Sequence, residues 1–114
     1  MTRAYKILSR ADWDDAVAKG QFDGAPIDLA DGYIHLSTAE QAAETLRRHF
    51  AGRTDLVLVA FEAEALGPQL KWEPSRGGAL FPHLYAPLPA AAAIDVQDLV
   101  LGADGDFQLG ELPA

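Results

Sequence analysis

The chain has 114 residues, 49% of them hydrophobic and none of them cysteine, and its seventeen acidic and nine basic residues give a net charge of −8. This length fits one domain over residues 1–114, and the apolar runs are too short for a signal peptide or a membrane span, so we expect a cytoplasmic protein. The composition excludes disulfides and cysteine-bound metals, and the acidic balance argues against a general nucleic-acid binder, which needs clustered Lys and Arg.

The first elements in chain order are a strand and a short helix. Residues 4–8 are predicted to form a strand, with alternate side chains on its two faces. Ser9 precedes Asp12 by three positions, which predicts a capped helix start, and Gly20 predicts the end of that helix. Residues 21–32 are rich in Gly, Pro and Asp, and this composition predicts a loop.

A second strand and a second helix follow this loop. Residues 33–36 are predicted to form the strand. Thr38 with Gln41 has the spacing of a capping box, and the apolar residues that follow recur at helical spacing, which predicts a helix over residues 39–50. Residues 56–62 are almost entirely apolar, as is typical of a strand that is buried on both faces.

The last third of the chain is predicted to form strands alone. Residues 70–73, 93–101 and 107–109 are expected to be strands, the last two joined as a hairpin. Residues 81–89 contain three prolines, so we expect an edge strand or an extended segment there. The order of elements predicts an α+β fold, with two helices on a mixed, largely antiparallel sheet.

The first candidate site lies where the strand over 33–36 meets its helix. Tyr33, His35 and Ser37 share one face of the strand, because strand side chains alternate. Free N–H groups at the helix start, near Thr38, offer a place for a phosphate or carboxylate. In the alternative interpretation, His35 only hydrogen-bonds the preceding loop and Ser37 only caps the helix.

The second candidate site lies in the proline-rich segment. His83 and Tyr85 have the same two-residue spacing, and together they could form one wall of a pocket in which a ring stacks. In the alternative interpretation, this segment is a structural edge and His83 faces solvent.

A third group joins an aromatic ring to charges of both signs. Trp72 and Glu73 are adjacent, with Arg76 nearby, and Glu73 could bind a sugar hydroxyl or act as a general base. The alternative is that Glu73 pairs with Arg76 or caps the turn.

Two other chemistries find little support in the sequence. His35, His83 and Glu73 could form a metal site with two His and one carboxylate, but no short metal-binding spacing is present, so we predict no metal. A Ser-His-Asp hydrolase is disfavoured because the G-x-S-x-G turn is absent.

Several segments together resemble one bacterial family, domain of unknown function 952. The resemblance runs over about residues 4–100 and is carried by residues 31–41 (DGYIHLSTAEQ), 55–66, 70–73 (LKWE) and 81–89 (FPHLYAPLP). It implies a fold similar to that of ADP-ribosyltransferases, nearest to the RNA 2′-phosphotransferase branch. It further implies that His35 and Ser37 face a pocket for NAD or ADP-ribose.

The residues and the resemblance lead to a first hypothesis, a transferase of ADP-ribosyl or phosphoryl type that binds NAD or another small nucleotide. A catalytically inactive module that binds a small ligand or a protein segment is the main alternative, and a purely structural protein is a third. The predicted catalytic residues are His35, Glu73 and His83, and the predicted ligand-binding residues are Tyr33, Ser37, Thr38, Trp72, Arg76 and Tyr85.

Overall fold

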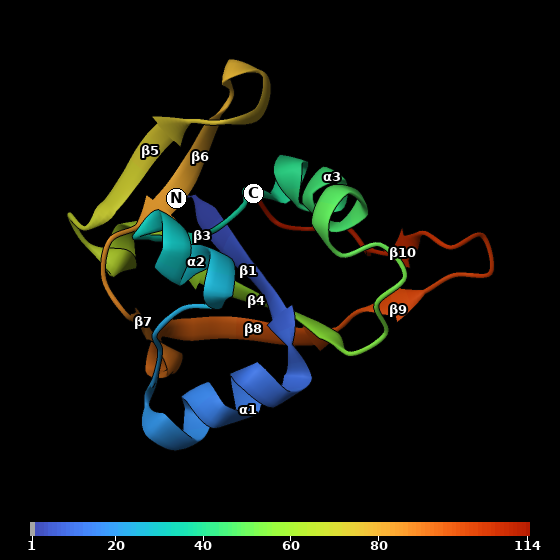
Figure 1. Ribbon diagram of the computed structural model, residues 1–114, viewed down its shortest axis with the longest axis horizontal. Helices are drawn as coiled ribbons and strands as arrows, with labels where there is room; N and C mark the ends of the chain where they lie inside the picture. The colour runs from blue at the N-terminus through green and yellow to red at the C-terminus, as the bar shows by residue number, and fades with distance from the viewer. Residues whose placement is uncertain (1) are drawn as a thin grey trace.

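A three-stranded antiparallel sheet lies at the centre of the computed structural model, which describes residues 2–114 (Figure 1). Its strands, in sheet order, are β1 (Arg3–Ser9), β4 (Leu56–Glu62) and β8 (Ala93–Asp98). Six of the seven residues of β4 are buried, because strands pair with both of its edges and side chains pack on both of its faces. The prediction of a fully buried strand over 56–62 is confirmed.

A second antiparallel sheet has β6 as its middle strand (Figure 1, upper left). Its strands, in sheet order, are β3 (Ile34–His35), β6 (Leu80–Leu84) and β5 (Leu70–Pro74). The prediction that prolines keep residues 81–89 out of a central strand is therefore wrong for β6. Pro82 lies opposite the point where β3 has ended. Its carbonyl accepts a hydrogen bond from Leu36 N at 3.1 Å. Because proline lacks an N–H, only one hydrogen bond is lost on the side of β6 that faces β3.

Two short strand pairs complete the β structure. β2 (Gln21–Phe22) pairs with β7 (Leu88–Pro89), so the end of the proline-rich segment is extended, as predicted. β9 (Val100–Leu101) and β10 (Phe107–Gln108) form the predicted hairpin.

Short 3-10 turns connect several of these strands, and a break at Leu99 separates β8 from β9. The strand predicted over 93–101 is interrupted at Leu99, whose N–H turns to the Leu56 carbonyl at 3.0 Å while its side chain is buried. The turns are η1 (Ala63–Leu66), η2 (Arg76–Gly78) and η3 (Ala90–Ala92). Within residues 2–114, no helix is both long and apolar enough to cross a membrane.

Helix α1 (Arg10–Lys19) begins and ends where the sequence predicts. The Oγ atom of Ser9 accepts a hydrogen bond from the Asp12 N–H at 3.0 Å. The helix ends at Gly20, whose φ of 101° is readily adopted only by glycine.

Helix α2 (Pro26–Asp31) lies inside the segment predicted to be a loop, so residues 2–114 form three α-helices rather than the predicted two. Pro26 occupies its first turn, where a missing N–H costs nothing, and the Asp28 carboxylate accepts the Ala25 N–H at 2.8 Å. Gly32, with a φ of 85°, ends the helix. The Gly, Pro and Asp residues therefore mark the two ends of a short helix.

Helix α3 (Ala39–His49) begins with the predicted capping box. Thr38 N donates to the side chain of Gln41 at 3.0 Å, and Gln41 N donates to Thr38 Oγ1 at 3.3 Å. The buried face of the helix includes Leu46, which packs on the central sheet.

Thr38→Ala is expected to lower the free energy of unfolding by about 0.5–2 kcal/mol, because it removes the side-chain acceptor at the start of α3. Urea denaturation followed by circular dichroism measures this loss. Thr54→Ala, in the exposed turn before β4, is the matched control. A loss no greater than that of the control would contradict a stabilising role for the cap.

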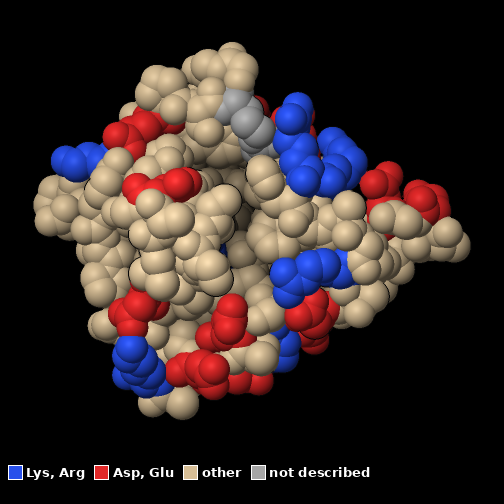
Figure 2. All heavy atoms as spheres, viewed as in Figure 1, with Lys and Arg blue, Asp and Glu red and all other residues tan. Residues whose placement is uncertain are grey.

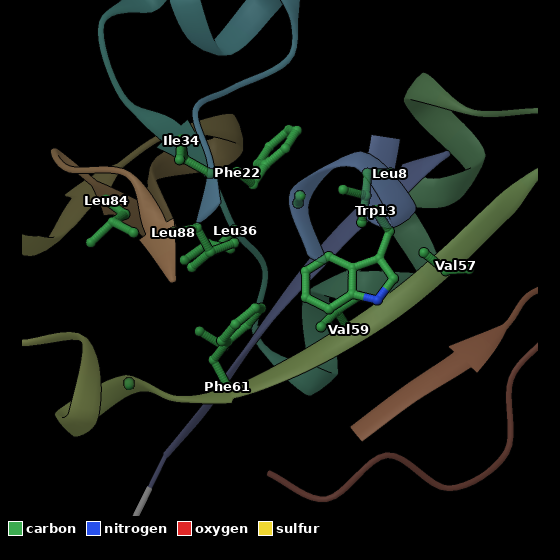
Figure 3. Close-up of a cluster of buried hydrophobic side chains, with 13 residues drawn as sticks. Leu8, Trp13, Phe22, Ile34, Leu36, Val57, Val59, Phe61, Leu84 and Leu88 are labelled. Carbon is green, nitrogen blue, oxygen red and sulfur yellow. The ribbon is translucent and has the colours of Figure 1, made fainter. Parts of the chain in front are cut away.

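The core consists of two hydrophobic clusters on opposite faces of β4. In the larger one, Trp13 of α1 meets Phe61 of β4 edge-on, with ring centroids 6.4 Å apart, and Ile34 and Leu84 of the second sheet join them (Figure 3). The smaller cluster lies under α3. Because the second sheet buries its Ile34 and Leu84 face in the larger cluster, its opposite face carries the alternate, mostly polar side chains.

Candidate functional site

Four aromatic side chains gather on the polar face of the second sheet. His35 of β3 lies directly opposite His83 of β6, and their ring centroids are 5.8 Å apart. Tyr33 lies among the others, with its centroid 4.1 Å from that of His83, 4.7 Å from His35 and 5.2 Å from Tyr85. We refer to Tyr33, His35, His83 and Tyr85 as the ring cluster. The structure therefore brings together residues from both candidate segments.

Glu73 of β5 joins the ring cluster through two hydrogen bonds to one carboxylate oxygen. Its Oε1 lies 2.8 Å from Nδ1 of His83 and accepts from the Tyr85 hydroxyl at 2.7 Å. The Tyr85 hydrogen bond, followed by that of His83, lowers the pKa of Glu73, and the same carboxylate raises the pKa of Tyr85. The charged carboxylate of Glu73 is therefore partly exposed and lies beside the buried imidazole of His83.

His35 lies between two carboxylates that both come from α2. Its Nδ1 is 2.6 Å from Oδ1 of Asp28, and its Nε2 is 2.9 Å from Oδ2 of Asp31. The imidazole is about one-third exposed, whereas that of His83 is almost fully buried. The position of α2 thus fixes the orientation of the His35 ring.

Asp28 connects His35 to a buried lysine. The two oxygens of Asp28 accept from Lys6 Nζ at 3.0 and 3.3 Å, and one of them accepts the His35 N–H at 3.0 Å. Burial alone would raise the pKa of Asp28, but the His35 hydrogen bonds and the Lys6 charge hold it well below its ordinary value. Burial lowers the pKa of Lys6, against the attraction of Asp28. Lys6 also donates to the His35 carbonyl at 3.0 Å.

Three other predicted residues lie away from the ring cluster. Ser37 is buried, its Oγ is 3.1 Å from Oγ1 of Thr45, and its backbone pairs with that of Tyr5 in the central sheet. Thr38 caps α3. Trp72 pairs with Pro82, and by strand alternation its side chain points to the face of β5 opposite Glu73. The expectation that Ser37 and the helix start at Thr38 converge with His35 on one point is therefore corrected, because the chain passes to the other sheet after Leu36.

Arg76 begins the turn η2, and its side chain lies outside the part of the chain that the structure describes. Lys71 is a described basic residue that the strand register places next to the ring cluster, because it lies directly across from His83. Within residues 2–114, no three His, Asp or Glu side chains converge as a metal site.

Two described surface hollows lie outside the ring cluster. One shallow hollow of about 440 Å³ lies between the start of α1 and the bend after β8, and another of about 260 Å³ lies beside α1 and the start of α2. No ring-cluster residue lines either hollow. Figure 2 shows a further depression near the middle of the side that it draws, between the positions of α2 and α3 in Figure 1.

Asp28 and Asp31 are absent from the predicted site residues, because both fall within the segment predicted to be a loop. The sequence A-P-I-D contains a usable signal, namely a proline at the first helical position and an acid two residues later, near the helix start. A helix there would have placed Asp28 and Asp31 close in space, and both carboxylates contact His35.

Chemically, the site presents two imidazoles, each held at Nδ1 by a carboxylate. Such a partner fixes the orientation of the ring and the tautomer, as in histidines that transfer protons. The second nitrogen of His35 meets Asp31. Carboxylate and imidazole groups from β3, β5, β6 and α2 thus lie beside one another, together with the Tyr85 hydroxyl.

Glu73→Gln is expected to lower the pKa of Tyr85 toward 10, because the neutral amide no longer disfavours the phenolate. A pH titration of tyrosine absorbance at 295 nm measures the change. Tyr85→Phe in the Glu73→Gln background assigns it among the three tyrosines. An unchanged titration curve would contradict the Tyr85–Glu73 hydrogen bond.

Comparison with known proteins supplies a family and a close structural match. The family model described as protein of unknown function (DUF952) matches residues 7–96. The crystal structure of protein CC0527 from Caulobacter crescentus is 59% identical, with 94% of each chain covered and a TM-score of 0.91. The solution NMR structure of CC0527 is 60% identical, covering 96% of this chain and 95% of that chain, with a TM-score of 0.86. No curated protein matches.

Proposed function

This chain belongs to the DUF952 family, and we propose that it binds a small nucleotide-like ligand on the ring cluster. The ligand class is one that combines an aromatic ring with sugar hydroxyls, such as a mononucleotide, ADP-ribose or NAD. The observation that carries the proposal is the gathering of four aromatic rings around a charged carboxylate, Glu73, on one sheet face.

The rings supply a stacking surface. Tyr85 is 41% exposed, so much of its ring is open to a ligand ring. The Tyr33 ring contacts it, with centroids 5.2 Å apart. A base or nicotinamide ring stacked there would gain an interaction of about 0.5–1.5 kcal/mol beyond the apolar area that it buries.

The Glu73 carboxylate supplies the sugar contact. It is ionised at neutral pH and 38% exposed, so its free oxygen can accept hydrogen bonds from ribose hydroxyls. His83, held by Glu73 through Nδ1, is the group that would exchange a proton in such a reaction. This arrangement supports a transferase of ADP-ribosyl or phosphoryl type over a module that only binds.

Isothermal titration calorimetry with adenosine, AMP, ADP-ribose and NAD tests the proposal. The wild-type protein is expected to bind at least one of them, and Glu73→Gln is expected to weaken binding about tenfold or more, since hydrogen bonds to charged groups are worth about 1.5–3 kcal/mol. His49→Ala removes the histidine outside the ring cluster and is the matched control. Absence of binding by the wild type at millimolar concentration of all four would overturn the proposal.

A separate assay distinguishes the transferase from a module that only binds. Release of nicotinamide from NAD, or of phosphate from AMP, by wild-type protein and its loss in His83→Ala would establish turnover. Binding without release of either product would favour the inactive module.

A further inference from the structure

The two carboxylates that contact His35 differ sharply in how firmly they are held. Asp28 is buried and fixed by Lys6, by the His35 N–H and by the Ala25 N–H. The side chain of Asp31 is 44% exposed, and among the polar contacts described within residues 2–114 it meets only Nε2 of His35. Asp28 is therefore a permanent partner of the ring, whereas Asp31 can be exchanged.

Asp31 also occupies an electrostatically unfavourable position. It is the last residue of α2, where the helix dipole is negative, and α2 has no basic residue in its last turn. Glu73 adds further negative charge, and after burial the carboxylates of Asp31, Glu73 and Asp28 raise the pKa of the neighbouring Tyr33. His35 thus holds the Asp31 carboxylate at a point where the surroundings otherwise repel it.

We propose that Nε2 of His35 is the oxyanion subsite of the nucleotide site, and that the Asp31 carboxylate occupies this subsite until a phosphate group of the ligand displaces it. This inference rests on the proposed function, because it assigns the phosphate end of the same ligand.

The charges around the subsite match a phosphate once Asp31 has moved away. Lys6 neutralises Asp28, so once Asp31 has left, Nε2 of His35 has no acceptor among its described contacts. Lys71 lies across from His83 on the same sheet face and adds a positive charge. Tyr85 and Glu73 then lie beyond His83, where the ring and the hydroxyls of a nucleotide would reach them.

The test is to measure the affinities of inorganic phosphate, AMP and adenosine for the wild type, Asp31→Asn and Asp14→Asn by calorimetry. Asp31→Asn keeps the shape of the side chain but removes the competing charge. Asp14→Asn, on the exposed side of α1, changes the net charge equally and is the matched control. Thermal unfolding of each variant establishes that it is folded.

The expected result is that Asp31→Asn binds phosphate and AMP about tenfold more tightly than the wild type does, while its affinity for adenosine changes less than about twofold. Addition of phosphate should also shift the Nε2 resonance of His35 in long-range ¹H–¹⁵N NMR spectra. If Asp31→Asn bound inorganic phosphate more tightly than the wild type but did not bind AMP more tightly, the assignment to a nucleotide phosphate would be overturned.

Failure of this inference is distinguishable from failure of the proposed function. If the wild type binds adenosine or AMP but Asp31→Asn gives no gain for AMP, the displacement is overturned and the nucleotide site stands. If no nucleoside or nucleotide binds either protein, both are overturned. An equal gain in Asp14→Asn would attribute the effect to net charge and overturn the displacement.

Discussion

Asp28→Ala is expected to lower the free energy of unfolding by about 3–5 kcal/mol, the usual loss when one partner of a buried ion pair is removed. At about 4 °C per kcal/mol, Tm falls by about 12–20 °C. The variant leaves the Lys6 ammonium buried without its carboxylate and removes the acceptor of the Ala25 and His35 N–H groups. Urea and heat denaturation followed by circular dichroism measure the loss.

Asp23→Ala is the matched control, because its ion pair with Lys19 is exposed. Removal of an exposed pair is expected to cost less than about 1 kcal/mol. Equal losses in the two variants would contradict a stabilising role for the buried pair.

The contribution of Asp28 also has a defined pH dependence. Because its folded-state pKa is depressed, the stabilisation is fully present above the unfolded value of about 3.9 and declines as the pH falls toward the folded value. The difference in stability between the wild type and Asp28→Asn should therefore narrow as the pH falls below about 4. A difference that widens on acidification would contradict the assignment.

Tyr33→Ala is expected to lower the free energy of unfolding by about 2–4 kcal/mol and to abolish nucleotide binding. The Tyr33 ring is the one that contacts all three other members of the ring cluster, and each aromatic contact contributes about 0.5–1.5 kcal/mol. Its loss would leave His83 and Tyr85 without the surface that holds them in place. Urea denaturation measures the stability, and calorimetry measures the affinity.

Tyr33→Phe separates the ring from its hydroxyl. This variant keeps the stacked geometry, so we expect stability and affinity close to those of the wild type. A Tyr33→Ala variant that is folded and retains wild-type affinity would show that the ring cluster does not form the ligand site.

Local signals in the sequence predicted the elements that depend on neighbouring residues. Ser9, Gly20 and Thr38 act within one turn of their helices, and the apolar run of β4 reflects burial that any central strand requires. The α+β class followed from the order of these elements. The i, i+2 spacing likewise predicted that each pair shares one strand face, Tyr33 with His35 and His83 with Tyr85.

Non-local geometry explains what the sequence did not predict. Pro82 is tolerated in a central strand only because β3 stops one residue short of it, and no feature near Pro82 specifies the length of β3. The partnership of Asp28 with Lys6 joins residues on different elements, so it depends on how α2 packs against β1. Strand alternation predicts that Ser37 shares the face of His35, whereas the chain leaves the second sheet after Leu36 and Ser37 pairs with Tyr5.

The register of the strands also implies an order of assembly during folding. β5 and β6 pair across a short connection, with Pro74 opposite Leu80, so this hairpin, which carries Glu73 and His83, closes a small loop and can form early. The central sheet pairs Arg3 with Glu62, which are far apart in sequence, and such non-local pairing is slow. We therefore expect the Glu73–His83 pair to exist in the folding chain before His35 reaches it, so that the ring cluster is complete only after this hairpin has formed.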